Sequence, residues 1–201
     1  MKIRTTILTV WLTLILVTIS YLFWHNEWKY SLPTPVPAKY RAAEKGDTIN
    51  LKNKLFAGSY KPSFIHFYNP ECPCSKFNIP HVNSLVKKYG AKINFAIVVM
   101  NSNEKYTVEE IQDKFNPGIP VLFDKSMADS CGVYSTPQAV ILDADHKLYY
   151  RGNYNKSRYC TDKNSYYAQM AIDSLLTNNL NPTFTKYALE AYGCALPLCT
   201  K

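Results

Sequence analysis

The chain has 201 residues, of which 47% are hydrophobic, and its formal net charge is +8. This is enough apolar material for one core of ordinary single-domain size, and no internal repeat or low-complexity run divides it. The lysines are spread along the chain, with Lys87 and Lys88 the only adjacent basic pair, and no zinc-finger, RNP or helix-turn-helix signature accompanies them. We therefore exclude a nucleic-acid-binding protein and interpret the charge as a solvated basic surface close to anionic lipid.

A short basic N-terminus, residues 1–6, precedes a long uncharged stretch at residues 7–24. This stretch is close to the roughly 20 residues that a helix needs to cross a bilayer, and aromatic residues gather at its far end as they do at a membrane interface. No small-x-small cleavage site follows it, as would be expected after a signal peptide. We predict an uncleaved transmembrane anchor, with the N-terminus inside and the domain on the extracytoplasmic, periplasmic side of the cell membrane.

Residues 25–45 form a proline-rich linker between this anchor and the domain. Proline alternates with other residues at Pro33, Pro35 and Pro37, a pattern that favours extended polyproline geometry and resists helix. We expect a stiff spacer that holds the domain near the membrane surface. A first strand is predicted at residues 47–51.

The most informative stretch places a cysteine where a buried strand turns into a helix. Residues 63–67 are rich in aromatic and branched side chains, as in a central strand, and apolar positions at helical spacing then continue to Tyr89. Cys72 falls at the N-cap of this helix and Pro73 at its first position. Free backbone N–H groups and the helix dipole should lower the pKa of the Cys72 thiol, although Glu71 opposes this and Lys76 partly offsets Glu71. We expect Cys72 to be a nucleophile.

Strands and helices alternate through the rest of the chain. The predicted elements are a strand buried on both faces at 93–100, a helix at 108–115, a short strand at 120–123, a helical turn at 126–131, a strand at 138–143, a hairpin turn at 143–146 leading into 147–152, and a helix at 165–176. This alternation predicts an α/β sheet covered on both sides.

The pair Thr136-Pro137, which leads into the strand at 138–143 and a hairpin that ends in Tyr-Arg-Gly, resembles the thioredoxin superfamily. The resemblance covers about residues 46–180 and is closest to the redoxin branch, which includes the alkyl hydroperoxide reductase/thiol-specific antioxidant (AhpC/TSA) proteins and the membrane-tethered thiol-disulfide thioredoxins of bacterial cell envelopes. It implies a thioredoxin-like fold, a central mixed β-sheet flanked by helices, here preceded by one transmembrane helix. It also implies a cis peptide bond at Pro137 and backbone hydrogen bonds from Thr136 to a substrate peptide.

The chain departs from the thioredoxin Cys-x-x-Cys pattern. Cys72 takes the place of the attacking cysteine and Ser75 that of the resolving one, while Cys74 comes one residue early. Residues two apart on a helix point to different sides, so a bond between Cys72 and Cys74 would be strained. The resolving thiol stays open between Cys74 and Cys131, and Cys131 is equally readable as a buried thiol.

Three further cysteines lie outside the motif, at Cys160, Cys194 and Cys199. We expect structural pairing among them in an exported protein, with a connectivity that the sequence does not give. Cys194 and Cys199 belong to a C-terminal tail, residues 181–201, and its Gly-Cys pair resembles the tails of some redoxin-branch relatives.

Our first functional hypothesis is a membrane-anchored thiol-disulfide oxidoreductase. Cys72, Cys74, Thr136 and Pro137 would be its catalytic residues, protein thiols or disulfides its substrates, and an envelope electron donor its partner. The redox-active cysteines would serve without a further cofactor. The sequence names neither the substrate nor the direction of electron flow.

Two alternative functions and a redox-inactive role stay open. A redoxin-type thiol peroxidase would oxidise Cys72 to a sulfenic acid, but Asn69 stands where that branch usually has threonine or serine, and only Arg151 or Arg158 could supply its arginine. A thioredoxin-fold copper chaperone would bind Cu(I) through Cys72, Cys74 and His146. If the Cys-Pro-Cys motif is inert, the domain is a redox-inactive interaction module.

Overall fold

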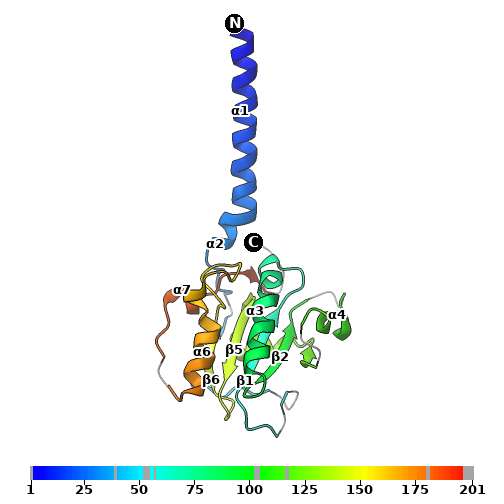
Figure 1. Ribbon diagram of the computed structural model, residues 1–201, viewed down its shortest axis with the longest axis vertical. Coiled ribbons are helices and arrows are strands. Elements are labelled where there is room, and N and C mark those ends of the chain that lie inside the picture. The colour runs from blue at the N-terminus through cyan, green and yellow to red at the C-terminus, as the bar shows by residue number, and fades with distance from the viewer. Residues whose placement is uncertain are drawn as a thin grey trace.

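The computed structural model describes residues 2–38, 40–51, 55–56, 58–101, 105–115, 118–179 and 182–196. A single long helix stands away from an α/β domain, with the N-terminus at its far end (Figure 1). It consists of α1 (Lys2–Phe23), the π-helical segment η1 (Trp24–Trp28) and α2 (Lys29–Ser31). No described residue of α1 is buried against the domain, and the stretch Lys2–Ser31 is long and apolar enough to cross a membrane.

A five-stranded mixed sheet forms the centre of the domain, in the order β3-β2-β1-β5-β6. The strands are β1 (Ser63–Tyr68), β2 (Asn94–Val99), β3 (Val121–Leu122), β5 (Gln138–Leu142) and β6 (Leu148–Gly152). β1 lies in the middle, parallel to β2 and antiparallel to β5. All six residues of β1 are buried, as expected of a strand covered on both faces.

Two hydrophobic clusters cover the two faces of the sheet. On one face, Phe64 and Tyr68 of β1 pack with α3 (Pro73–Tyr89), α4 (Val108–Gln112) and α6 (Tyr167–Leu176). On the other face, Ile65 and Phe67 pack with α5 (Ser126–Cys131) and with apolar residues of the segment 49–55. The alternation of side chains along β1 therefore divides the core between the two faces.

The predicted core elements are confirmed, with limited shifts at their ends. The helix predicted at 108–115 begins where expected, after the capping box of Thr107 and Glu110. It ends earlier, at Gln112. The helix predicted at 165–176 is a 3₁₀ turn, η2 (Lys163–Ser165), followed by α6. The strand predicted at 47–51 was wrong, because this segment makes only one isolated bridge, Thr48 to Lys147, and uses its apolar side chains to fill the core.

Three short elements were not predicted. They are β4 (Ser135–Thr136), α7 (Lys186–Leu189) and β7 (Cys194–Ala195). β4 and β7 pair with each other in a separate two-stranded ribbon. Elements of two to four residues are too short for a periodic pattern to appear in the sequence.

Candidate functional site

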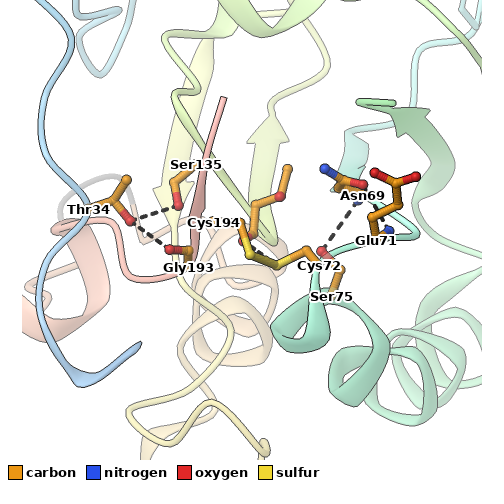
Figure 2. Close-up of a disulfide and its surroundings, with 9 residues drawn as sticks. Thr34, Asn69, Glu71, Cys72, Ser75, Ser135, Gly193 and Cys194 are labelled. Carbon is orange, nitrogen blue, oxygen red and sulfur yellow. Dashed lines mark hydrogen bonds between the residues drawn. A yellow bond between two sulfur atoms is a disulfide. The ribbon is translucent and has the colours of Figure 1, made fainter. Parts of the chain in front are cut away.

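Cys72 lies at the point where the chain leaves β1 and begins α3. It is the N-cap residue of α3, with extended backbone angles, and Pro73 occupies the first turn of the helix, as predicted. The turn before it is held by Asn69, whose carbonyl accepts from the Cys72 N–H at 3.0 Å and whose side-chain oxygen accepts from the Glu71 N–H at 3.0 Å. Ser75, which stands at the thioredoxin resolving position, instead accepts a hydrogen bond from the Asn69 N–H (Figure 2).

The start of α3 and the residue before it bear on the charge of the Cys72 sulfur. The first turn of α3 contains no acidic residue, so the positive end of the helix dipole is not neutralised from within the helix. The carboxylate of Glu71 forms an ion pair with Lys105, at 3.6 Å, so a lysine outside the helix is the cation that pairs with Glu71. The helix dipole therefore acts to stabilise a thiolate at Cys72, whereas complete burial and the nearby Thr136 carbonyl act against it.

Cys72 is joined by a disulfide to Cys194, 122 positions further along the chain, with a Cα–Cα distance of 6.1 Å (Figure 2). The side chain of Cys72 is completely buried, and that of Cys194 is 2% exposed. This corrects two expectations. The partner of Cys72 is neither Cys74 nor Cys131, and Cys194 does not pair with Cys160. The cause is the path of the C-terminal tail, which returns across the start of α3.

The cis-proline loop, residues 134–137, positions both cysteines. The Thr136–Pro137 peptide bond is cis, as the resemblance implied. The carbonyl oxygen of Thr136 lies 3.3 Å from the Cys72 sulfur, so it can accept a hydrogen bond from that thiol in the reduced protein. In the ribbon formed by β4 and β7, Thr136 also pairs directly with Cys194 in antiparallel register. The loop therefore contacts one sulfur-bearing residue and pairs with the other.

Thr34, in the proline-rich linker, is 2% exposed and fastens the tail to this loop. Its hydroxyl lies 3.0 Å from Ser135 Oγ and donates to the Gly193 carbonyl at 3.2 Å, while its N–H donates to the Ala191 carbonyl at 2.8 Å (Figure 2). The linker was expected to be only a spacer. At Thr34 it is part of the packed domain.

Cys74 lies beside the disulfide but outside it. Cys72, Cys74 and Cys194 form one buried cluster, against which Tyr30 from α2 packs. Cys74 also faces a hollow of about 350 Å³ that Pro137 and Cys160 help to line. The Cys160 thiol hydrogen-bonds Asn78 of α3, and burial, followed by the nearby Cys74, raises its pKa to about 12. The thiol of Cys160 is therefore kept protonated.

Cys131 belongs to the opposite face of the sheet. It ends α5 within the cluster that covers Ile65 and Phe67, is completely buried, and has its pKa raised to about 12 by burial. Arg151 donates to the Cys131 carbonyl at 3.3 Å without lowering that pKa enough to free a thiolate. Of the two readings left open for Cys131, the structure shows the buried thiol.

The residues named for the two alternatives gather at Cys72 only in part, since Cys74 lies in its cluster and His146 does not. His146 lies in the turn after β5, whereas Pro137 immediately precedes that strand, so the strand separates the histidine from the cysteines. Within the described ranges no three histidine, cysteine or acidic side chains form a group that could hold a metal ion. Of the two arginines, Arg151 binds the Ala43 and Cys131 carbonyls. Arg158 binds Asn26 and Glu27 at the end of η1 and also lines the hollow that Cys74 faces.

Two buried histidines lie between β1 and the helices. His66 Nδ1 is 2.6 Å from the Tyr154 hydroxyl, and His81 on α3 packs against Tyr166 with ring centroids 4.5 Å apart. Burial lowers the pKa of His66 to about 3 and that of His81 to about 4. Both side chains are therefore neutral parts of the core.

Sequence and structure comparisons agree with this architecture. A family model described as "Domain of unknown function (DUF6436)" matches residues 41–198. None of the curated proteins matches the chain. An uncharacterized conserved protein from Geobacillus kaustophilus superposes with a TM-score of 0.61 at 20% identity, over 82% of this chain and 98% of its own.

Two further solved structures are similar. A hypothetical protein from Sinorhizobium meliloti 1021 gives a TM-score of 0.57 at 19% identity, over 69% of this chain and 80% of its own. The thioredoxin domain of a thiol-disulfide oxidoreductase from Bacteroides vulgatus gives 0.44 at 17% identity, over 60% and 96%. The sheet order, the cysteine at the start of α3 and the cis-proline loop beside it make the fold thioredoxin-like, as predicted.

Sequence reasoning found one half of the disulfide and missed the other. Cys72 was identified by its place between a strand and a helix, but Cys194 has no such local pattern around it. The available signal was the Gly193-Cys194 pair in the tail, which resembles the tails of redoxin-branch relatives. Cys199 lies outside the described residues, so its expected pairing stays a prediction.

Proposed function

The chain belongs to the family described as Domain of unknown function (DUF6436), and we propose that it acts as a thiol-disulfide oxidoreductase in which Cys72 is the nucleophile and Cys194 the resolving cysteine. The observation that carries the proposal is the Cys72–Cys194 disulfide at the N-terminus of α3, in contact with the cis-proline loop. A helix N-terminus stabilises the thiolate that must leave or attack in every exchange step.

In the reduced protein, the Cys72 thiolate attacks one sulfur of a substrate disulfide. A Cys72–substrate disulfide forms and the second substrate sulfur leaves as a thiolate, which takes up a proton. Cys194 then attacks the Cys72 sulfur and releases the substrate thiol, which regenerates the Cys72–Cys194 disulfide. The same steps in reverse oxidise a substrate dithiol. The electrons are held by the cysteines, and the proposal includes no further cofactor.

We further propose that the enzyme is anchored in the cell membrane with its domain on the extracytoplasmic side. The helix Lys2–Ser31 has the length and hydropathy of a membrane span. Its end is bound to the domain, since Arg158 pairs with Glu27 at 3.6 Å and Tyr30 packs over the cysteine cluster. This contact supports a site at the end of the domain nearest the bilayer, in a compartment where disulfides persist. Protein thiols or disulfides and an envelope electron donor are the proposed partners.

The proposal is tested by thiol exchange with the full chain in detergent after reduction with dithiothreitol and removal of the reductant. A small aromatic disulfide reports each attack by the colour of its released thiol. We expect Cys72→Ser to abolish rapid release. The reduced unmodified chain should release two aromatic thiols through Cys72 and Cys194, whereas Cys194→Ser should release one and keep the other as a trapped mixed disulfide on Cys72. Cys131→Ser is the matched control, because that thiol is buried on the opposite face.

A Cys72→Ser variant that retains the full rate of release would contradict the proposal. The role of Cys74 is decided in the same assay. If Cys74, and not Cys194, resolves the mixed disulfide, Cys74→Ser traps it and Cys194→Ser does not.

A further inference from the structure

The tail segment, residues 193–196, is bound along the cis-proline loop as an extended strand. Its register pairs Cys194 with Thr136 and Ala195 with Ser135 in antiparallel orientation. The next residue continues the contact, since the Leu196 N–H donates to the Tyr134 carbonyl at 3.0 Å. An open strand edge of this kind offers main-chain hydrogen bonds to any extended peptide.

The tail segment also blocks access to Cys72 and Cys194. Cys72 is completely buried and Cys194 nearly so, which leaves no path by which a second protein could reach either sulfur while the tail is in place. The tail must leave the loop before a substrate can be attacked. The substrate cysteine then has to reach the position that Cys194 occupies in this structure, beside the Cys72 sulfur.

The residue before the cysteine has no room for a side chain. A Cβ built on Gly193 would collide with the Thr136 carbonyl oxygen and would lie 2.9 Å from both the Thr136 carbonyl carbon and Ser135 Oγ. Two of these three atoms belong to the backbone of the cis-proline loop, so they cannot turn aside as a flexible side chain would. The loop accepts a glycine at this position and strongly disfavours larger residues.

The residue two places after the cysteine has an apolar site. Leu196 packs against the hydrophobic cluster on the α5 face of the sheet. It lines a hollow of about 430 Å³ together with Met100, Val133 and Tyr134. The same hollow is also lined by Arg41, Lys125 and Asp129, so the apolar contact is the one that Leu196 makes with the cluster. A small polar side chain in place of Leu196 would lose that packing.

We propose that the tail segment is a built-in copy of the substrate, and that the enzyme selects extended protein segments of the form Gly-Cys-x-apolar. The inference rests on the proposed function and adds the substrate class to it. Release follows from the same geometry. When Cys194 returns to attack Cys72, its strand competes with the substrate for the same edge of β4, so formation of the Cys72–Cys194 disulfide and displacement of the substrate occur together.

The experiment uses the full-length Cys194→Ser variant in detergent, reduced, with three synthetic peptides activated as disulfides of thionitrobenzoate. The first contains Ser-Gly-Cys-Ala-Leu-Ser, the second has valine in place of glycine, and the third has serine in place of leucine. Attack by Cys72 releases coloured thionitrobenzoate. The Cys72→Ser/Cys194→Ser double variant measures the background from the other thiols.

We expect the glycine peptide to react at least about tenfold faster than the valine peptide, and several-fold faster than the serine peptide, which lacks the apolar side chain. A tenfold ratio corresponds to 1.4 kcal/mol. Equal rates for the three peptides, above the double-variant background, would overturn the substrate inference and leave the proposed function standing. So would reaction of Cys72 with the small aromatic disulfide but with none of the peptides. Rates no higher than the double-variant background for every reagent would overturn the proposed function itself.

A second variant tests the same collision within the protein itself, with Cys194 present. Gly193→Val should weaken docking of the tail, so the Cys72–Cys194 disulfide forms more slowly while the glycine peptide reacts faster than with the unmodified chain. If Gly193→Val forms the disulfide at the unmodified rate, the collision at Thr136 does not restrict this position and the inference is wrong.

Discussion

Thr34 and Ser135 are 101 positions apart, and their hydroxyl oxygens lie 3.0 Å from each other in a buried contact. Thr34 comes from the segment that follows the membrane-length helix, and Ser135 from the strand that precedes the cis proline. The same Thr34 hydroxyl donates to the carbonyl of Gly193 in the tail. One side chain thus connects the linker, the cis-proline loop and the segment that carries Cys194.

Thr34→Val should loosen the tail without changing its cysteine. The substitution keeps the shape of the side chain but removes its hydroxyl, and the loss of a buried hydrogen bond costs about 1 kcal/mol or somewhat more. We expect dithiothreitol to reduce the Cys72–Cys194 disulfide about fivefold faster, as measured by alkylation and mass spectrometry. Thr177→Val is the matched control, because its exposed hydroxyl bonds only within α6 and the following turn. Equal acceleration in both variants would argue against the connection.

The cysteines of the reduced native protein should react with iodoacetamide in a definite order. Cys72 lies at a helix N-terminus, and once the disulfide is reduced the tail that covers it can leave, whereas burial in the core raises the pKa of both Cys131 and Cys160 to about 12. At about pH 8 we expect Cys72 to be labelled first and Cys131 to be labelled only after the protein is denatured. Peptide mapping by mass spectrometry gives the rates, and native labelling of Cys131 as fast as that of Cys72 would contradict this order.

The stability of the domain should fall as the pH is lowered from about 6.5 to about 4. Burial lowers the pKa of His66 to about 3 and of His81 to about 4, so over this range the unfolded chain binds protons at both positions and the folded chain binds few. Each histidine contributes a slope of about 1.4 kcal/mol per pH unit. The measurement is the urea midpoint by near-ultraviolet circular dichroism. His81→Phe keeps a ring beside Tyr166 and should reduce the slope by one proton; an unchanged slope would exclude His81 as a source.

The full chain should stay with the membrane fraction after extraction at alkaline pH. The helix Lys2–Ser31 is apolar, and its first part is not covered by the domain, so its transfer to water would expose a continuous hydrophobic surface. Intact mass measured on the extracted pellet checks that the anchor is retained. Recovery of a shortened protein in the soluble fraction would show instead that the segment is a cleaved signal sequence.

Local patterns in the sequence predicted the elements that build the sheet and one half of the site. The apolar run before Asn69 specifies β1, and the N-cap and first-turn preferences of Cys72 and Pro73 specify the start of α3. The Thr136–Pro137 pair, through its resemblance to a known superfamily, also placed the cis peptide bond correctly. These features depend on neighbouring residues, so a single sequence is enough to recognise them.

The errors have a common physical cause. Ile49 and Leu51 have the composition of a strand, but the competition for buried positions places them under the sheet with one isolated bridge at Thr48. Cys74 was a candidate partner for Cys72 because of its closeness in sequence, although residues two apart at a helix start point to different sides. The actual partner, Cys194, is brought to Cys72 by tertiary packing.

The amino-acid sequence alone established an apolar N-terminal helix, an α/β domain and the place of Cys72 at a helix start, because helix capping, periodicity and strand propensity act over a few residues. It did not identify Cys194 as the partner of Cys72, the hydrogen bonds of Thr34 to the loop and the tail, or the pairing of β7 with the edge of β4. Those depend on contacts between segments more than 50 residues apart, such as the 122 positions between Cys72 and Cys194. A two-residue strand has no pattern of its own, so its partner is selected only when the folded domain presents an open edge, a space for Gly193 and an apolar site for Leu196.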